Sequence, residues 1–428
     1  MTSTSDVCSH SSLTLIPSRS AFDTGFSWST AQKRAAAVTL QGRAPLNPSN
    51  PAQTLFPAPL VLPEDELFLD PKYPAQSLRS WTRSKERNRV TKEKRTIYVA
   101  EPPSVDPNLD AIRQWSQPKV PRVTVMSEPR IQEVIDYLTA FYHGVNVKQL
   151  PTKLVYTSSN TGKLPSNIGQ RHGHIGLNIG NECVRIRTRV SKDFFIQQLN
   201  LDDLLDAATS LLPNDAYALL LLVSHDIYEN EEDDFACGRA YGGSRIAVVS
   251  TARYNPVLDV VQNIDREHSW PASHCSTYVQ SCCTQSAKSL RKKRHKKTGT
   301  KKELEQSSND GPGPIYAALA AHRALPSSQS PSACSGLWLA RVCRTASHEL
   351  GHCFGMDHCI YYACAMQGTA SLAEDARQPP YVCPVDLAKI LQACSTTRKL
   401  RYEALLSFCD KYKDVRHFSA FAAWIQSQ

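Results

Sequence analysis

The sequence predicts an α/β (α+β) fold, in which the strands of a sheet are combined with helices. Two observations favour this fold class. Strand-like runs alternate with helical stretches from Thr96 to Val249, and the last part of the chain, Pro384 to Gln428, is mainly helical. The chain has 428 residues, of which 41% are hydrophobic and 21% charged, as is usual for globular proteins. This length accommodates one large or two modest domains.

The individual elements follow from the spacing of the apolar residues. Pro129–Val145 carries apolar side chains three and four residues apart, which predicts a helix. Leu201–Leu212 has the same pattern and is ended by Pro213. Strands are predicted where apolar residues run together or alternate, at Thr96–Ala100, Lys153–Tyr156, Cys183–Val190, Ala216–Val223 and Arg245–Val249.

Two segments fall outside this pattern. Residues 1–60 are rich in Ser, Thr and Pro and have no clear periodicity, so we expect a disordered N-terminal segment. Residues 61–428 are expected to form one domain. Within it, residues 255–330 combine the basic tract Arg291–Lys297 with Gly, Ser and Pro, which predicts a low-complexity basic insertion at the surface.

Hydropathy and charge limit the partners of the protein. The longest strongly apolar run, Ala216–Val223, has eight residues, whereas a membrane-spanning helix needs about 20, so we expect no membrane partner. The net charge is 49 − 40 = +9, and nine Lys and Arg residues between Lys288 and Lys302 account for all of it. No aromatic residues interleave with this tract, which indicates a solvated loop and no nucleic-acid partner; a nuclear-localisation signal is the alternative.

The cysteines point to a reducing compartment. There are fourteen, eight of them from Cys334 onward, and the first twenty residues lack the basic start and apolar core of a secretory signal. In a long chain of this kind we expect reduced thiols or metal ligands and an intracellular, cytoplasmic protein, with nuclear import through 291–297 as an option. Arg171–His174, and His274–Cys275 with Cys282–Cys283, show no recognisable ligand spacing and are interpreted as surface or core residues.

Residues 348–358 have the spacing of a metal site, reading His-Glu-Leu-Gly-His-Cys-Phe-Gly-Met-Asp-His. On a helix, His348 and His352 lie one turn apart on one face, so that both imidazoles can reach one ion. Glu349 stands at the edge of that face, where its carboxylate can act on a water molecule without binding the metal. Gly355 can end the helix with a positive φ, and His358 then returns as a third ligand. Three nitrogen ligands leave one position open, as in catalytic zinc sites.

With the residues that follow, this segment resembles the signature of the archaemetzincins, a family of metzincin-type zinc peptidases. The close resemblance covers His348 to Ile390 and includes Cys359, Cys364, Met366 and Cys383. It implies a twisted mixed sheet with an active-site helix, a Met-turn at Met366 and a Cys-rich, mainly helical C-terminal part. It also implies a second, structural zinc on Cys359, Cys364 and Cys383. The sequence departs from the family pattern at Asp386, where a cysteine is common; Asp386 or Cys394 is the candidate fourth ligand.

The resemblance implies a zinc metallopeptidase that acts on a peptide or protein substrate, with Glu349 as general base; a monomer is the favoured state. The alternative is a catalytically silent, zinc-stabilised binding or adaptor protein, against which the intact Glu349 argues. Where some metzincins have a Tyr after the Met-turn, this chain has Gln367–Gly368, and Tyr361 and Tyr362 are interpreted as packing residues. No residue is therefore assigned to the oxyanion. Arg245–Val249, preceded by Gly242–Gly243, is the candidate edge strand for substrate.

Overall fold

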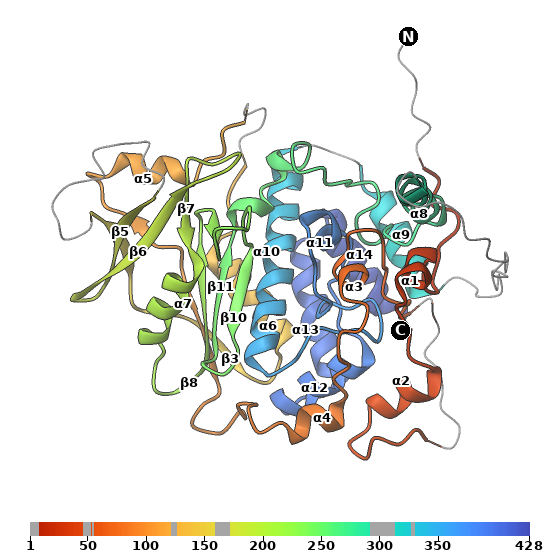
Figure 1. The fold of residues 1–428 in the computed structure, drawn as a ribbon. Coiled ribbons are helices and arrows are strands. Elements are labelled where there is room, and N and C mark those ends of the chain that lie inside the picture. The colour runs from red at the N-terminus through yellow and green to blue at the C-terminus, as the bar shows by residue number, and fades with distance from the viewer. Residues whose placement is uncertain are drawn as a thin grey trace, which may run out of the picture.

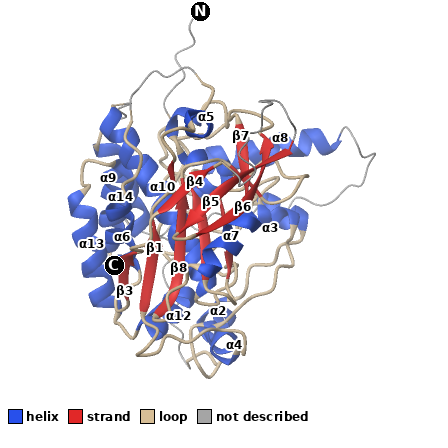
Figure 2. Ribbon diagram, turned by 90° about the vertical axis from the view of Figure 1, so that its left-hand side faces the viewer, coloured by secondary structure: helices blue, strands red, loops and turns tan. Residues whose placement is uncertain are grey.

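The computed structural model describes residues 8–45, 53, 55–120, 126–158, 172–291, 313–326 and 330–428, without the side chains of 285–291. The strands form two mixed sheets, and helices cover both faces of the five-stranded sheet (Figures 1 and 2). The predicted α/β (α+β) class is confirmed, and the strands are divided between two sheets.

The first sheet has five strands in the order β10-β11-β8-β1-β3. Its central strand, β8, is completely buried because helices cover both of its faces: Leu220 and Leu222 point into one hydrophobic core, and Leu219 and Leu221 into the other. All neighbours are parallel except β10, which pairs antiparallel with β11. The strands are β1 (Thr96–Ala100), β3 (Asn146–Gln149), β8 (Ala216–Val223), β10 (Gly238–Tyr241) and β11 (Ile246–Ser250).

The second sheet has six strands in the order β2-β4-β5-β6-β7-β9. Its longest pair is an antiparallel hairpin, β5 with β6, and helix α7 lies between this sheet and the first. The hairpin projects at the left of Figure 1. The strands are β2 (Ser104–Val105), β4 (Leu154–Thr157), β5 (His172–Ile179), β6 (Glu182–Val190), β7 (Gln197–Asn200) and β9 (Ile227–Tyr228).

Helix α10 is the central helix and packs with α6 on the face of the first sheet opposite to α7. The C-terminal helices lie on the far side of α10 from the sheet (Figure 1). The helices are α1 (Arg19–Thr24), α2 (Ala31–Ala37), α3 (Glu66–Leu69), α4 (Leu78–Arg83), α5 (Asp110–Trp115), α6 (Ile131–Phe141), α7 (Leu201–Ser210), α8 (Ser276–Arg291), α9 (Pro314–Ala324), α10 (Pro331–Cys353), α11 (Leu372–Arg377), α12 (Pro384–Cys394), α13 (Arg398–Lys411) and α14 (Arg416–Gln426), with 3-10 turns at Ala252–Tyr254 and Pro256–Leu258. Within the described residues, none of these helices combines the length and apolar character that crossing a membrane requires.

The prediction of a disordered N-terminal segment, 1–60, is wrong for the residues that the structure describes. Ser18 and Thr30 cap α1 and α2 by accepting hydrogen bonds from Ala21 N and Lys33 N. The segment lies along the body of the protein, where Ala21 is fully buried and Trp28 donates its indole N–H to Tyr361 O. Its low share of apolar residues is offset by contacts with distant parts of the chain, which composition does not reveal.

The prediction of a low-complexity insertion over 255–330 also needs correction. Residues 255–275 fold against the body, and Leu258 and His274 are buried. Helix α9 packs on α14 through Ile315 and Ala318, both fully buried. The Lys/Arg-rich tract 292–297 lies outside the described residues. Its composition dominated the prediction for the whole segment.

Candidate metal centre and active site

The segment 348–358 occupies the end of α10 and the turn after it. The helix starts at Pro331, where Ser330 accepts from Ala333 N, and its last turn carries His352. It ends at Cys353, and two residues later Gly355 has a φ of +74°, which other residues rarely adopt. A Cβ at Gly355 would also collide with Arg87. The chain therefore turns back sharply and brings His358 beside the face of the helix.

The three imidazoles converge on one point. The Nε2 atoms of His348 and His352 are 3.1 Å apart, and the ring of His358 lies 5.3 Å and 5.0 Å from their centroids. Each Nδ1 lies 2.7 Å from an oxygen: Ala365 O for His348, Met356 O for His352 and Glu66 Oε1 for His358. Because these oxygens accept, each Nδ1 carries the proton and each Nε2 presents its lone pair.

This donor set fits a zinc ion. Two ligand nitrogens of a tetrahedral zinc lie about 3.3 Å apart for Zn–N bonds of about 2.05 Å, and the possible ligand atoms of the three histidines lie within 4.8 Å of one another. Burial lowers the pKa of His348 well below its usual value and that of His352 to about 4, so both rings are neutral, as metal ligands must be. For His358, burial acts in the same direction, but the hydrogen bond and charge of Glu66 raise its pKa overall.

Glu66 was not found by sequence reasoning, because it lies 292 residues before its partner His358. A carboxylate that accepts the second N–H of a metal-binding histidine fixes the ring and raises its basicity. The neighbouring Asp65 is held by the buried Arg377, at 2.5 Å and 3.1 Å, and Glu66 N donates to Glu374 Oε2 at 2.9 Å. The described N-terminal arm is thus anchored to α11 directly beside the histidines.

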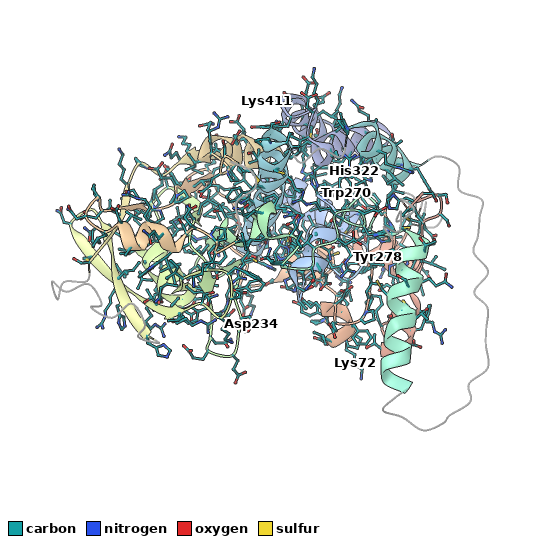
Figure 3. All side chains as sticks on the ribbon, turned by 90° about the horizontal axis from the view of Figure 1, so that it is seen from above. Lys72, Asp234, Trp270, Tyr278, His322 and Lys411 are labelled. Atoms are coloured by element: carbon teal, nitrogen blue, oxygen red, sulfur yellow. The ribbon has the colours of Figure 1, made fainter. Side chains whose placement is uncertain are left out.

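Glu349 lies in a pocket of about 470 Å³ that also exposes His348 and His358. Its side chain is only 8% exposed, and burial raises the pKa of this carboxyl to about 8. Residues 233–238 line one side of the pocket and residues 369–372 another. Viewed from above, Asp234 and Lys72 stand on opposite sides of the recess in the molecule (Figure 3).

The strand at the pocket is not the predicted one. Residues 246–250 form β11, which is internal because β8 and β10 flank it. The edge strand is β10, and its first residue, Gly238, passes so close to the active-site helix that a Cβ there would lie 3.3 Å from Glu349 Cγ. Periodicity predicts a strand but not its neighbours, so the order of the two strands could not be read from the sequence.

Gln367 lines the same pocket, with a side chain that is 2% exposed. Among the described residues, neither its amide nitrogen nor its amide oxygen has a hydrogen-bond partner. Tyr361 and Tyr362 are buried and do not line this pocket, in keeping with their interpretation as packing residues. An unpartnered buried amide costs stability. A hydrogen bond between Gln367 and a ligand bound in the pocket would remove this cost.

A second cluster contains Cys359, Cys364, Cys383 and Asp386, all buried, with possible ligand atoms within 4.8 Å of one another. The Sγ atoms of Cys359 and Cys383 are 3.5 Å apart, and Asp386 Oδ2 lies 3.3 Å from Cys364 Sγ. The other carboxylate oxygen accepts from the buried Lys389 at 2.8 Å. A set of three thiolates and one carboxylate around Zn²⁺ has a net charge of −2, which Lys389 reduces to −1. Cys394, the alternative fourth ligand, is not in this group of atoms.

Met366 lies beneath the active-site helix and is fully buried. A Cβ at Gly351, inside the histidine motif, would collide with its Sδ, so the two residues fit together closely. The backbone of this turn holds the ring of His348 through Ala365 O and the backbone of Cys359 through Met366 O. The turn therefore connects the two clusters.

Comparisons with known proteins find relatives of this chain. The model of peptidase family M54 matches residues 331–392. Archaemetzincin-2 of Homo sapiens is 24% identical over 361 residues, covering 84% of this chain and 76% of its own length. Archaemetzincin-2 of Rattus norvegicus is 43% identical over 72 residues, which are 17% of this chain and 20% of that protein. Among solved structures, archaemetzincin from Methanopyrus kandleri aligns with a TM-score of 0.33 and 17% identity over 70% of this chain and 97% of its own.

Proposed function

Since this chain belongs to the archaemetzincins, a family of zinc metallopeptidases, we propose that it hydrolyses peptide bonds. Glu349 acts as the general base. The observation that carries this proposal is the convergence of three Nε2 lone pairs at the pocket that contains Glu349. A zinc site built only for stability needs neither an open pocket nor a carboxyl group inside it.

His348, His352 and His358 are the proposed ligands of the catalytic zinc, which when bound supplies a polarised water and a Lewis acid for the substrate carbonyl. Ala365 O, Met356 O and Glu66 keep the three rings in the tautomer that presents Nε2. Glu349 accepts the proton of the attacking water and passes it to the leaving amine. We propose that Gln367, whose amide has no partner among the described residues, donates its N–H to the carbonyl oxygen as negative charge develops there.

The substrate is proposed to bind as an extended peptide along β10. This strand pairs with β11 on one side. Its first residue and the three residues before it, 235–238, line the pocket. An added strand satisfies backbone groups of an edge strand, while the pocket receives alternate side chains. Cys359, Cys364, Cys383 and Asp386 are the proposed ligands of the second zinc. Intracellular localisation and the monomeric state stay predictions.

The test compares wild type with Glu349→Ala on a defined peptide mixture, with products read by mass spectrometry and bound zinc measured in the same samples. Glu403→Ala, at an exposed position of α13, is the matched control. We expect Glu349→Ala to keep its zinc and to lose turnover by at least about 100-fold, as for loss of a general base, while the control cleaves normally. Wild type that holds zinc but cleaves neither the peptide mixture nor denatured proteins would contradict the proposal. A catalytically silent, zinc-stabilised binding protein would then be the better interpretation.

A further inference from the structure

A third group of metal-ligating side chains shares no residue with the pocket and lies where the N-terminal segment meets the loop before α8. Cys8 and His10 come from the first segment, and His268 and Cys275 from the loop. The two segments are adjacent in space: Leu13 forms a β-bridge with Cys275, and Thr14 N donates to His274 O at 2.7 Å. In Figure 1 the first described residues, in red, pass beside α8, and Figure 3 marks the place by Tyr278 in the first turn of that helix.

The four ligand atoms have the spacing of a tetrahedral site. They lie within 4.8 Å of one another, the same limit that holds for the other two clusters. The Sγ atoms of Cys8 and Cys275 are 3.5 Å apart. Zn–S bonds of about 2.3 Å at the tetrahedral angle place two thiolates about 3.8 Å apart. The rings of His10 and His268 are perpendicular, at 89°, with centroids 5.2 Å apart.

The hydrogen bonding of the two histidines also points to a missing ligand. His10 is 8% exposed, yet neither of its ring nitrogens has a partner among the described residues. His268 donates from Nδ1 to Asp265 Oδ2 at 2.7 Å, and its Nε2, beside Cys8, makes no hydrogen bond of good geometry. A histidine whose second nitrogen is bound by a carboxylate is the usual arrangement at metal sites. Stacking on Tyr278, at 4.4 Å and 6°, fixes the plane of this ring.

We propose that Cys8, His10, His268 and Cys275 bind a further zinc ion. Two thiolates and two imidazoles are the soft and borderline donors that favour zinc, and four protein ligands close the coordination sphere, as in structural sites. The site is independent of the proposed catalytic function. It joins residues more than 250 positions apart and fixes the start of the described chain, a region that frays in most proteins unless it is tied down.

The experiment uses the full chain, expressed with zinc, purified under a mild reductant and analysed for zinc per chain. Cys8→Ser is expected to hold one zinc fewer than wild type. Cys183→Ser, which alters an exposed thiol on β6, is expected to match wild type. Cys8→His offers a nitrogen in place of the sulfur and should restore the count. Equal zinc in wild type and Cys8→Ser would overturn the proposal.

A second measurement needs no variant and decides the matter if Cys8→Ser unfolds. Native, reduced wild type is treated with iodoacetamide, and the modified cysteines are located by mass spectrometry. Although Cys8 is partly exposed, it and Cys275 should be protected until a chelator is added. Rapid alkylation of Cys8 in the zinc-loaded protein refutes the site. A Cys8–Cys275 disulfide in wild type purified without reductant, together with rapid alkylation of both thiols in the reduced, zinc-loaded protein, would replace the site by a covalent cross-link.

Discussion

Replacing Glu66 by Ala should weaken zinc binding at the three histidines, although Glu66 itself does not contact the metal. Its Oε1 accepts from His358 Nδ1 at 2.7 Å. A hydrogen bond to a charged group contributes about 1.5–3 kcal/mol, and the side chain of Glu66 is 25% exposed, so solvent screening favours the lower end of this range. About 1.4 kcal/mol corresponds to a tenfold weaker affinity, at the low end of the roughly 10–100-fold losses seen for such partners.

The assay follows turnover against buffered free zinc and reads the concentration at half-maximal activity. Glu66→Ala should shift it about tenfold upward. Glu66→Gln, whose amide oxygen still accepts from Nδ1, should shift it less. Glu64→Ala, an exposed neighbour, serves as the control. A shift below twofold for Glu66→Ala would refute the role assigned to this residue.

Gly368 offers an independent perturbation of the same contact. A Cβ at this position would collide with the carboxylate of Glu66, the flexible end of that side chain, so Gly368→Ala should fold and displace the carboxylate from His358. It should weaken zinc binding in wild type and have no further effect in the Glu66→Ala background. Additive effects would mean that Gly368 acts on the site by another route.

Three further predictions concern single side chains. Gln367→Met should lower turnover by about 100-fold, as for loss of an oxyanion donor, and raise stability by about 1 kcal/mol by removing an unpartnered buried amide; unchanged turnover would exclude the assigned contact. Asp386→Ala should release one zinc per chain and leave the buried Lys389 without its carboxylate, at a cost of about 3–5 kcal/mol in denaturant unfolding, whereas an unchanged zinc count would speak for another fourth ligand. Burial lowers the pKa of His225 from 6.5 to about 4, so the unfolded chain binds more protons between these values and stability falls as the pH drops through this range. From pH 7 to pH 5 wild type should lose about 2 kcal/mol more than His225→Gln in urea unfolding; parallel curves would contradict this.

The sequence predicted well what is determined locally. The spacing of His348 and His352, the positive φ at Gly355 and the buried run of β8 are all properties of a few consecutive residues. The sequence-based predictions were wrong or incomplete where contacts between residues distant in the sequence determine the structure. The N-terminal helices are held by contacts with the body, the place of β10 at the edge depends on its neighbours, and Glu66 is 292 residues from His358. The same reason hides the group at Cys275, whose partner Cys8 is 267 residues away.

The position of Glu66 has a consequence for the newly made polypeptide. During synthesis the N-terminal arm leaves the ribosome long before the three histidines. Asp65 and Glu66 can form their contacts with Arg377 and Glu374 only after α11 has been made. The hydrogen-bond acceptor of His358 is therefore in place only after the N-terminal arm has packed against α11. It also follows that a fragment with the residues matched by the family model, 331–392, contains every proposed ligand of the catalytic metal and still lacks Glu66, the acceptor of the His358 ring N–H. The residues that build the site therefore extend beyond the segment that the family model matches.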